Sequence, residues 1–205
     1  MSQRKSREET ARATRVRLLE RAAELLLEQG FAATSTRQIA QAAEVTERTL
    51  FNIVASKSEL LRQVVLSAVV GTSSGPLLER EDFKAAVQAT TVEEFVDCFV
   101  RAVASLHERS AALAEVVRQA AAVDAGAAEF WAWGVAQQVA DCRELVREVK
   151  RRGWLGSPRT AVRVADSLAI LTGHETYYRL VHERGWDVRT YRRWLYQQCL
   201  HDLAT

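Results

Sequence analysis

Only two prolines, Pro76 and Pro158, interrupt this chain of 205 residues. Proline removes a backbone donor and breaks helices, so the long proline-free stretches on either side can be helical throughout. Apolar residues recur within them at helical spacing, as at Leu18, Ala22 and Leu25, and no stretch alternates in the manner of a strand. The sequence therefore predicts an all-α protein with about nine helices.

Signals for helix ends divide the chain into these segments. Small polar residues at a helix start accept hydrogen bonds from free backbone N–H groups, and glycine past a helix end tolerates a left-handed backbone. Residues 71–82, "GTSSGPLLERED", are predicted to be a loop or linker. The first predicted helix spans about Arg12 to Gln29, and the predicted glycine stops are Gly30, Gly153 and Gly185. The later helices are predicted to start at Ser35 with Gln38, Thr46, Ser56 with Glu59, Thr91 with Glu94, Ser110, about Ala127, Ser157-Pro158 and Asp187.

Positive charge is concentrated at the N-terminus. Residues 1–62 carry a net charge of +3, whereas the remaining residues carry −1. The first seventeen residues contain six basic side chains, Arg4, Lys5, Arg7, Arg12, Arg15 and Arg17, against Glu8 and Glu9. A basic arm on a nearly neutral body suggests an anionic partner such as nucleic acid, although a solvated tail is an equally simple interpretation.

Several classes of protein find no support in the sequence. The N-terminus lacks the apolar core of a signal peptide, and no stretch reaches the ~18 apolar residues of a membrane span. A cytoplasmic protein without membrane contact is therefore expected. The three cysteines form no Cys-x-x-Cys pair and are predicted to be buried reduced thiols. No nucleophile, acid–base or phosphate-loop motif stands out, so no enzymatic activity, cofactor or metal is predicted.

The segment "TERTLFNIVASKSEL", residues 46–60, carries the clearest functional signal. It follows a short helix after a tight turn, which is the arrangement of a helix-turn-helix. Arg48, Thr49 and Asn52 share one helical face, while Leu50 points to the opposite side. Arginine can bind guanine and asparagine can bind adenine through paired hydrogen bonds in the DNA major groove. An ordinary three-helix core with solvated Arg48 and Asn52 is the competing interpretation.

Residues 15–66 closely resemble the N-terminal domain of the TetR family of one-component transcriptional regulators. The matching positions extend from Leu18-Leu19 through Gly30-Phe31, Ala33-Thr34-Ser35, Arg37, Ile39-Ala40, Val45-Thr46 and Thr49-Leu50-Phe51 to Ser56-Lys57 and Leu60-Leu61. The C-terminal "YYRLVHERGWDVRTYRRWLYQQCL" also resembles the last two helices of many members.

The resemblance implies two domains and three partners. Residues 1–55 would form the DNA-binding helix-turn-helix domain with its basic arm, and residues 56–205 a helical domain for ligand binding and dimerisation. A homodimer would read a palindromic operator in double-stranded DNA and release it on binding a small effector. By matching position, the DNA-binding residues would be Arg37, Thr46, Glu47, Arg48, Thr49, Phe51 and Asn52, with Lys57 contacting a phosphate.

Three residues depart from the usual family pattern. Glu44 stands where the turn commonly has glycine, Phe51 where tyrosine is frequent, and Ile53 where histidine or tyrosine is frequent. The last two substitutions remove groups that could donate hydrogen bonds to phosphate. A second function is therefore considered, a dimeric ligand-binding or protein-interaction module with weakened DNA binding.

Aromatic residues mark two further candidate sites in residues 56–205. An apolar or aromatic effector is expected to contact Phe95, Phe99, Trp131, Trp133, Leu171 and His174, although core packing is the competing interpretation at each position. Because the family dimerises through its last two helices, the resemblance places the dimer interface at Tyr178, Trp186, Tyr191 and Trp194. Docking of the last helix onto its own chain is the alternative there.

Overall fold

The computed structural model describes residues 2–70, 76–156 and 160–204, which are helical with no strand among them. The first four helices are α1 (Ser2–Ala33), α2 (Thr36–Ala42), α3 (Glu47–Ile53) and α4 (Lys57–Val70). Two short 3-10 turns, η1 (Leu77–Glu79) and η2 (Glu81–Phe83), lead into α5 (Lys84–Gln88). The remaining elements are α6 (Val92–Ala120), α7 (Ala125–Arg151), α8 (Ala161–Leu171), α9 (His174–Tyr177), the π-helical η3 (Tyr178–Glu183) and α10 (Val188–Ala204). The predicted all-α class is confirmed.

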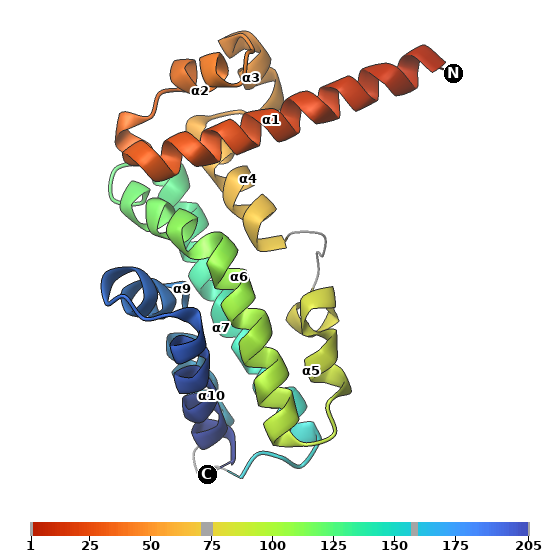
Figure 1. Ribbon diagram of the computed structural model, residues 1–205, viewed down its shortest axis with the longest axis vertical. Coiled ribbons are helices and arrows are strands. Elements are labelled where there is room, and N and C mark those ends of the chain that lie inside the picture. The colour runs from red at the N-terminus through yellow and green to blue at the C-terminus, as the bar shows by residue number, and fades with distance from the viewer. Residues whose placement is uncertain (1, 71–75, 157–159, 205) are drawn as a thin grey trace. The chain divides into compact units, whose positions relative to one another are not determined.

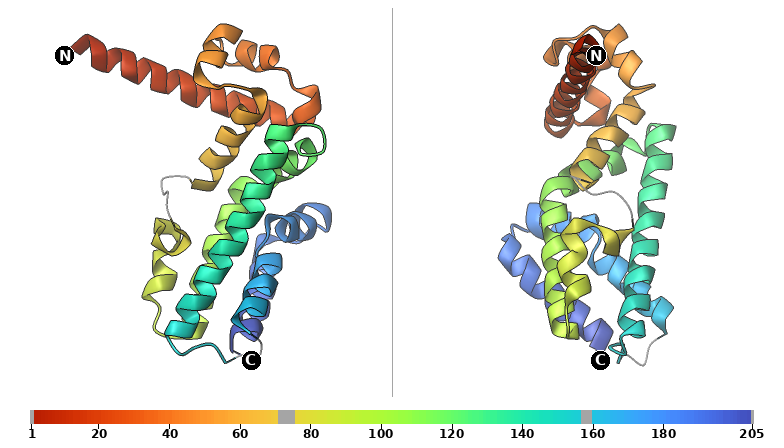
Figure 2. Two further views of the ribbon diagram at one scale, coloured as in Figure 1. Left: turned by 180° about the vertical axis from the view of Figure 1, so that it is seen from behind. Right: turned by 90° about the vertical axis from the view of Figure 1, so that its right-hand side faces the viewer.

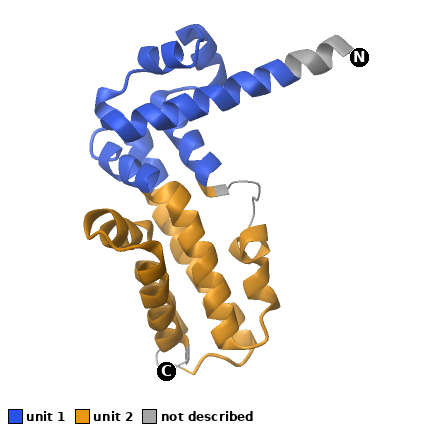
Figure 3. Cartoon of the chain, viewed as in Figure 1, with its two compact units in different colours: residues 1–68, 112–131 blue, residues 69–111, 132–205 orange. Residues whose placement is uncertain are grey.

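The chain forms two compact units, coloured separately in Figure 3. Unit 1 comprises residues 1–68 and 112–131, and unit 2 comprises residues 69–111 and 132–205. In unit 1, Figures 1 and 2 show α2 and α3 as two short helices beside the long α1. In unit 2, α8 and α10 pack against each other. The division into a DNA-binding domain and a ligand-binding domain near residue 55 concerns function and stays a prediction.

Five predicted helix starts agree with the structure, and at each of them a side chain caps the helix locally. Ser35 and Gln38 form a complete capping box at α2, and Thr46 caps α3. The hydroxyls of Ser56 and Thr91 accept hydrogen bonds from the N–H groups of Glu59 and Glu94. Asp187 caps α10 by accepting the Thr190 N–H at 2.7 Å. These starts depend on neighbouring residues alone, which explains why the sequence predicts them well.

Some predicted boundaries are wrong. The two helices predicted to start at Thr91 and at Ser110 form the single α6, because Ser110 is not a cap. Its hydroxyl donates to the Leu106 carbonyl at 2.8 Å, as serine does inside a helix. Helix α1 begins at Ser2 rather than Arg12, so the basic arm is helical. Of the predicted linker, residues 71–75 lie outside the described residues, whereas the following segment contains η1 and η2.

The helix predicted from Ser157 to His182 is divided in two. Its predicted start at Ser157-Pro158 lies outside the described residues, and α8 begins at Ala161 with Thr160 as its cap. The helix ends at Leu171 because the backbone leaves the helical conformation: Thr172 is the C-cap, and the next residue, Gly173, is extended. Gln138 of α7 donates to the Ala169 carbonyl at 2.8 Å near this break.

The core of unit 2 surrounds Phe95, Phe99, Tyr177 and Tyr191, which are almost completely buried. His107 belongs to this interior: its Nε2 lies 2.8 Å from the Thr172 carbonyl, and burial lowers its pKa to about 4. The imidazole is therefore neutral near pH 7, as expected for a core histidine. Among the cysteines, Cys142 and Cys199 are buried and free, as predicted, while Cys98 is half-buried. Burial raises the pKa of the Cys142 thiol to about 11.

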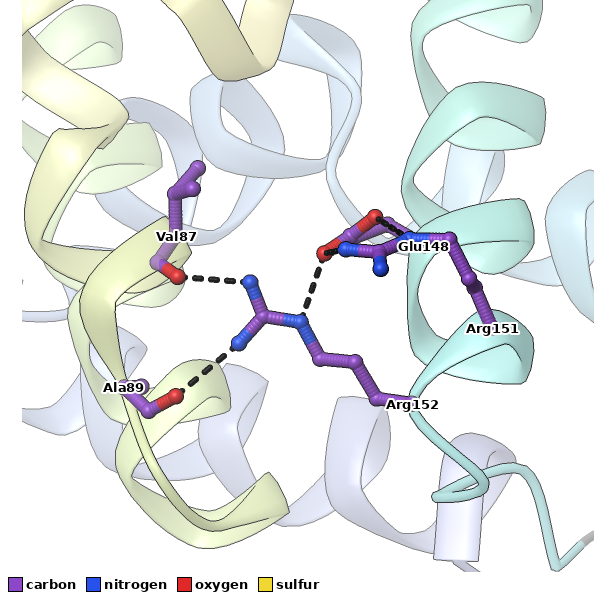
Figure 4. A network of polar contacts seen from close by, with 5 residues as sticks. All are labelled: Val87, Ala89, Glu148, Arg151 and Arg152. Atoms are coloured by element: carbon purple, nitrogen blue, oxygen red, sulfur yellow. Dashed lines mark hydrogen bonds and ion pairs between the residues drawn. The ribbon is translucent and has the colours of Figure 1, made fainter.

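Arg152 holds α5 and α7 together in unit 2 (Figure 4). Its Nε donates to the Glu148 carboxylate at 2.6 Å, while its two terminal nitrogens donate to the Val87 and Ala89 carbonyls at 2.5 and 2.9 Å. The guanidinium also lies 4.9 Å from the centre of the Trp154 ring. One side chain thus satisfies the carbonyls at the C-terminal end of α5.

Candidate nucleic-acid interface

Helix α3, the predicted recognition helix, is fixed by one cap and one buried leucine. The Thr49 N–H donates to the Thr46 hydroxyl oxygen at 3.1 Å, and the two threonine hydroxyls lie 2.9 Å apart. Leu50 is completely buried, in agreement with its predicted inward direction. The side chains of Glu47, Arg48, Phe51 and Asn52 are exposed. Helix α3 therefore presents a basic and an amide group to the solvent from a fixed backbone.

The turn between α2 and α3 places a glutamate in a left-handed conformation. Glu44 has a φ of 55° and is the only described residue other than glycine with a positive φ. Its N–H bonds to the Gln41 carbonyl and that of Val45 to the Ala40 carbonyl, which is the Schellman pattern of a helix end. The sequence expectation that Glu44 occupies a glycine position is correct. The turn also contacts α1, because Arg17 Nε donates a hydrogen bond to the Ala43 carbonyl at 2.8 Å.

Replacing Glu44 with glycine is expected to raise the free energy of unfolding by about 1 kcal/mol, because glycine adopts a left-handed backbone without a steric penalty. Chemical denaturation of both proteins measures this difference. The matched control is Glu20→Gly in the middle of α1, where the same substitution should lower stability by about 1 kcal/mol. Destabilisation by Glu44→Gly would show that the side chain of Glu44 contributes more than its backbone costs.

Two of the predicted DNA contacts also serve internal roles. Glu47 accepts a hydrogen bond from the Thr36 hydroxyl at 2.9 Å, which links α3 to the start of α2. The Lys57 ammonium group donates to the Phe31 carbonyl and lies 4.1 Å from the centre of the Phe31 ring. Burial lowers the pKa of Lys57. Arg37, in contrast, is exposed on α2. A phosphate contact by Lys57 would therefore compete with its bond to Phe31.

Ile53 and Phe51 differ in their surroundings. Ile53, the last residue of α3, is half-buried next to the buried Val54, whereas Phe51 is 49% exposed. On the basic arm, Arg12, Arg15 and Arg17 are exposed along α1. The side chains of Arg4, Lys5 and Arg7 lie outside the described residues.

The predicted effector contacts do not form one cluster. Phe95 and Phe99 are core residues of unit 2, stacked with centroids 6.5 Å apart, and Phe95 also packs edge-on against Trp154. Trp133 of the same unit is 51% exposed, while Leu171 and His174 are half-buried. Trp131 is half-buried and belongs to unit 1. Sequence periodicity identified the aromatic helices but could not distinguish their inward from their outward side chains.

The predicted dimer residues also have different positions. Tyr191 is completely buried in the core of its own chain, where its ring packs against Tyr177 at 4.9 Å, so it offers no surface to a partner. Tyr178, Trp186 and Trp194 are half-buried. Sequence analysis missed the outer face of α8, where Val162 is 57% and Ile170 is 74% exposed. Their spacing of eight residues places both on one side of the helix, a signal that was available in the sequence.

Comparison with known proteins relates the chain to regulators. Residues 18–64 match the family "Bacterial regulatory proteins, tetR family". Similar solved structures include GusR of Salmonella enterica, with a TM-score of 0.72, 18% identity, and coverage of 94% of this chain and 96% of the other.

NalD of Pseudomonas aeruginosa, the secondary repressor of the MexAB-OprM multidrug efflux pump, has a TM-score of 0.69 and 23% identity over 95% of this chain and 98% of its own. The complex of SmeT with triclosan has a TM-score of 0.72 and 18% identity over 94% and 92%. No curated protein matches significantly in sequence. Among the described residues, no helix is long and apolar enough to span a membrane. The same residues contain no cluster of three or more histidine, cysteine, aspartate or glutamate side chains that could hold a metal ion.

Proposed function

We propose that the chain is a transcription regulator that represses transcription as a ligand-responsive homodimer on a palindromic operator. Its residues 18–64 match the tetR family of bacterial regulatory proteins, which supports this role. The observation that carries the proposal is the outward face of α3. Arg48 and Asn52 are exposed there, on a helix that Thr46 caps and the buried Leu50 anchors.

This face has the chemistry needed to read bases. A helix of this size enters the major groove with its first turns against the base edges. Arg48 would donate both arms of its guanidinium to a guanine, and Asn52 would pair its amide with an adenine. Arg37 on α2 and the exposed arginines of α1 would contact phosphates, which set affinity but not sequence preference.

The alternative function, a dimeric ligand-binding or protein-interaction module with weakened DNA binding, has one specific observation in its favour. The Lys57 ammonium, a predicted phosphate contact, is already bound to the Phe31 carbonyl. The two functions differ in whether the exposed Arg48 and Asn52 discriminate between DNA sequences.

Dimerisation is proposed through α8 and α10. The exposed Val162 and Ile170 on α8 give an apolar surface, and the two helices already pack on each other. Contact of this surface with the same surface of a second chain would form a two-fold symmetric dimer. The two α3 helices of this dimer would read two half-sites. The interface would thus centre on α8 rather than on the buried Tyr191.

Effector release is proposed to act through the start of α4, which follows α3 after only three residues. Within unit 1, Gly126 at the beginning of α7 lies so close to α4 that a β-carbon there would be 2.7 Å from the Ser58 hydroxyl oxygen. Asp124 caps α7 by accepting the Ala127 N–H at 2.8 Å. A shift of this turn would therefore move Ser58, and with it α4. An apolar or aromatic effector is proposed, as in the SmeT complex with triclosan.

Base reading is tested by alanine substitutions of Arg48 and Asn52. Each is expected to weaken binding to the operator by about 1–3 kcal/mol and to relax the preference at one base pair. Lys57→Ala should instead weaken specific and random DNA alike and lower the salt slope by about one, if Lys57 leaves Phe31 to bind phosphate. Fluorescence anisotropy with both DNAs measures these values.

Arg143→Ala serves as the control, because Arg143 is an exposed arginine of unit 2 and should have no effect. Equal losses on operator and random DNA for Arg48→Ala would mean that Arg48 contacts only phosphate and would favour the alternative function.

A further inference from the structure

A groove in unit 2 lies between the first half of α6 and the first half of α10. Its volume is about 700 Å³, which is within the range of small-molecule sites. The α10 residues lining it are spaced three and four apart and so occupy one stripe of the helix. The lining residues are Asp97, Val100, Arg189, Arg192, Arg193 and Tyr196. None of the predicted effector contacts is among them.

The groove is strongly basic. Three of its lining residues are arginines, and none of the three takes part in an ion pair between described side chains. Its one carboxylate, Asp97, is already paired with Arg101 at 2.6 Å. The nearby Asp187 accepts hydrogen bonds from the N–H and hydroxyl of Thr190, although its charge also interacts with Arg189. The groove therefore has an excess of positive charge that the folded chain leaves uncompensated.

Arg192 supplies a second, independent observation. Its Nε is buried and has no hydrogen-bond partner among the described residues. A buried donor without a partner costs free energy, and more so when it belongs to a charged group. The Arg192 side chain as a whole is half-buried and lines the groove, so an acceptor there would bond to its guanidinium group and offset this cost.

The remaining lining is apolar. Val100 is almost completely buried, and Tyr196 is half-buried and presents an aromatic ring. The groove thus combines guanidinium groups with apolar surface. We propose that it binds a small amphipathic anion, whose oxyanion head group contacts Arg192 and Arg193 and whose apolar part packs on the half-buried Tyr196. Guanidinium groups bind carboxylates and phosphates through paired, charge-assisted hydrogen bonds, so either head group fits this chemistry.

This site is independent of DNA binding and of the predicted aromatic contacts. Its ligand would be charged, whereas the effector expected from the sequence is apolar or aromatic. Binding in the groove can therefore be present or absent whether or not α3 reads DNA, and the two proposals can fail separately.

The experiment is isothermal titration calorimetry of the full chain with octanoate, octyl phosphate and 1-octanol at constant pH and ionic strength. Octanoate and octyl phosphate separate the two head groups, and octanol reports the apolar part alone. We expect at least one of the anions to bind and octanol to bind at least about tenfold more weakly, because it lacks the charge-assisted bonds. The double variant Arg192→Gln/Arg193→Gln should weaken the anion by about tenfold or more.

Arg143→Gln on α7 is the matched control and should leave anion binding unchanged, and circular dichroism verifies that both variants are folded. A second variant, Tyr196→Ala, should weaken octyl phosphate more than inorganic phosphate. Failure of both anions to bind would overturn the proposal. Equal affinity of the wild type and the double variant for the anion would also overturn it. Equal binding of octyl phosphate and inorganic phosphate would overturn it as well, because it would indicate an adventitious ion only.

Discussion

Replacing Arg152 with methionine is expected to lower the free energy of unfolding by about 2–4 kcal/mol, because two carbonyls lose the charged donor that satisfies them. The Arg152 side chain is only 15% exposed, and its loss leaves the Val87 and Ala89 carbonyls without their guanidinium donor and the Glu148 carboxylate with Arg151 as its remaining partner. The methionine retains much of the side chain's apolar volume, so the loss reports mainly the polar contacts. The packing of the guanidinium on Trp154 would also be lost.

The matched control lies one residue earlier. Arg151 pairs with the same Glu148 carboxylate at 2.6 Å, but its side chain is 71% exposed. Arg151→Met should therefore cost far less stability than Arg152→Met, because an exposed ion pair is screened by solvent and contributes little. Urea denaturation of the three proteins measures both values. Equal losses for the two variants would mean that the bonds of Arg152 to the end of α5 contribute nothing of their own.

A second large effect is expected from Ile170→Asp. Ile170 is 74% exposed, so the substitution should leave the fold of the single chain intact while placing a charge in the proposed apolar interface. The protein should become monomeric. Loss of simultaneous binding to two half-sites should then lower operator affinity on the order of 100-fold. Sedimentation velocity measures the first effect and anisotropy the second.

Val123→Asp is the control for this experiment. Val123 is 73% exposed and follows α6 in unit 1, far along the chain from α8. The same substitution there should change neither the sedimentation coefficient nor operator affinity. If Ile170→Asp stays dimeric with the wild-type dissociation constant, the interface does not include this face of α8.

The sequence predicted those parts of the fold that depend on neighbouring residues. Caps such as Ser35, Thr46 and Asp187 bond within three residues of themselves, and Leu50 follows the period of its own helix. Glu44 could be assigned to a left-handed turn because the surrounding residues match a known family pattern. The helix-turn-helix could therefore be derived almost entirely from local signals and resemblance.

Features set by distant contacts could not be predicted in the same way. Ser110 is a local exception: it reads as a helix cap, but its hydroxyl bonds four residues back, inside α6. Tyr191 and Trp133 are both aromatic and amphipathic, yet one is completely buried and the other half exposed, because tertiary packing decides between them. The bonds of Arg152 to Val87 and Ala89 carry no sequence signal, since these partners are more than sixty residues away.

The central claim, that α3 reads a specific DNA sequence as part of a dimer, is tested most directly by selection from random double-stranded DNA. The full-length wild-type chain would be used alongside the Arg48→Ala/Asn52→Ala variant. The proposed function predicts that the wild type enriches an inverted repeat, with half-site centres about one helical turn of DNA or a multiple of it apart. The variant should enrich no such repeat. Enrichment of no motif by the wild type, or of the same motif by both proteins, would contradict the claim.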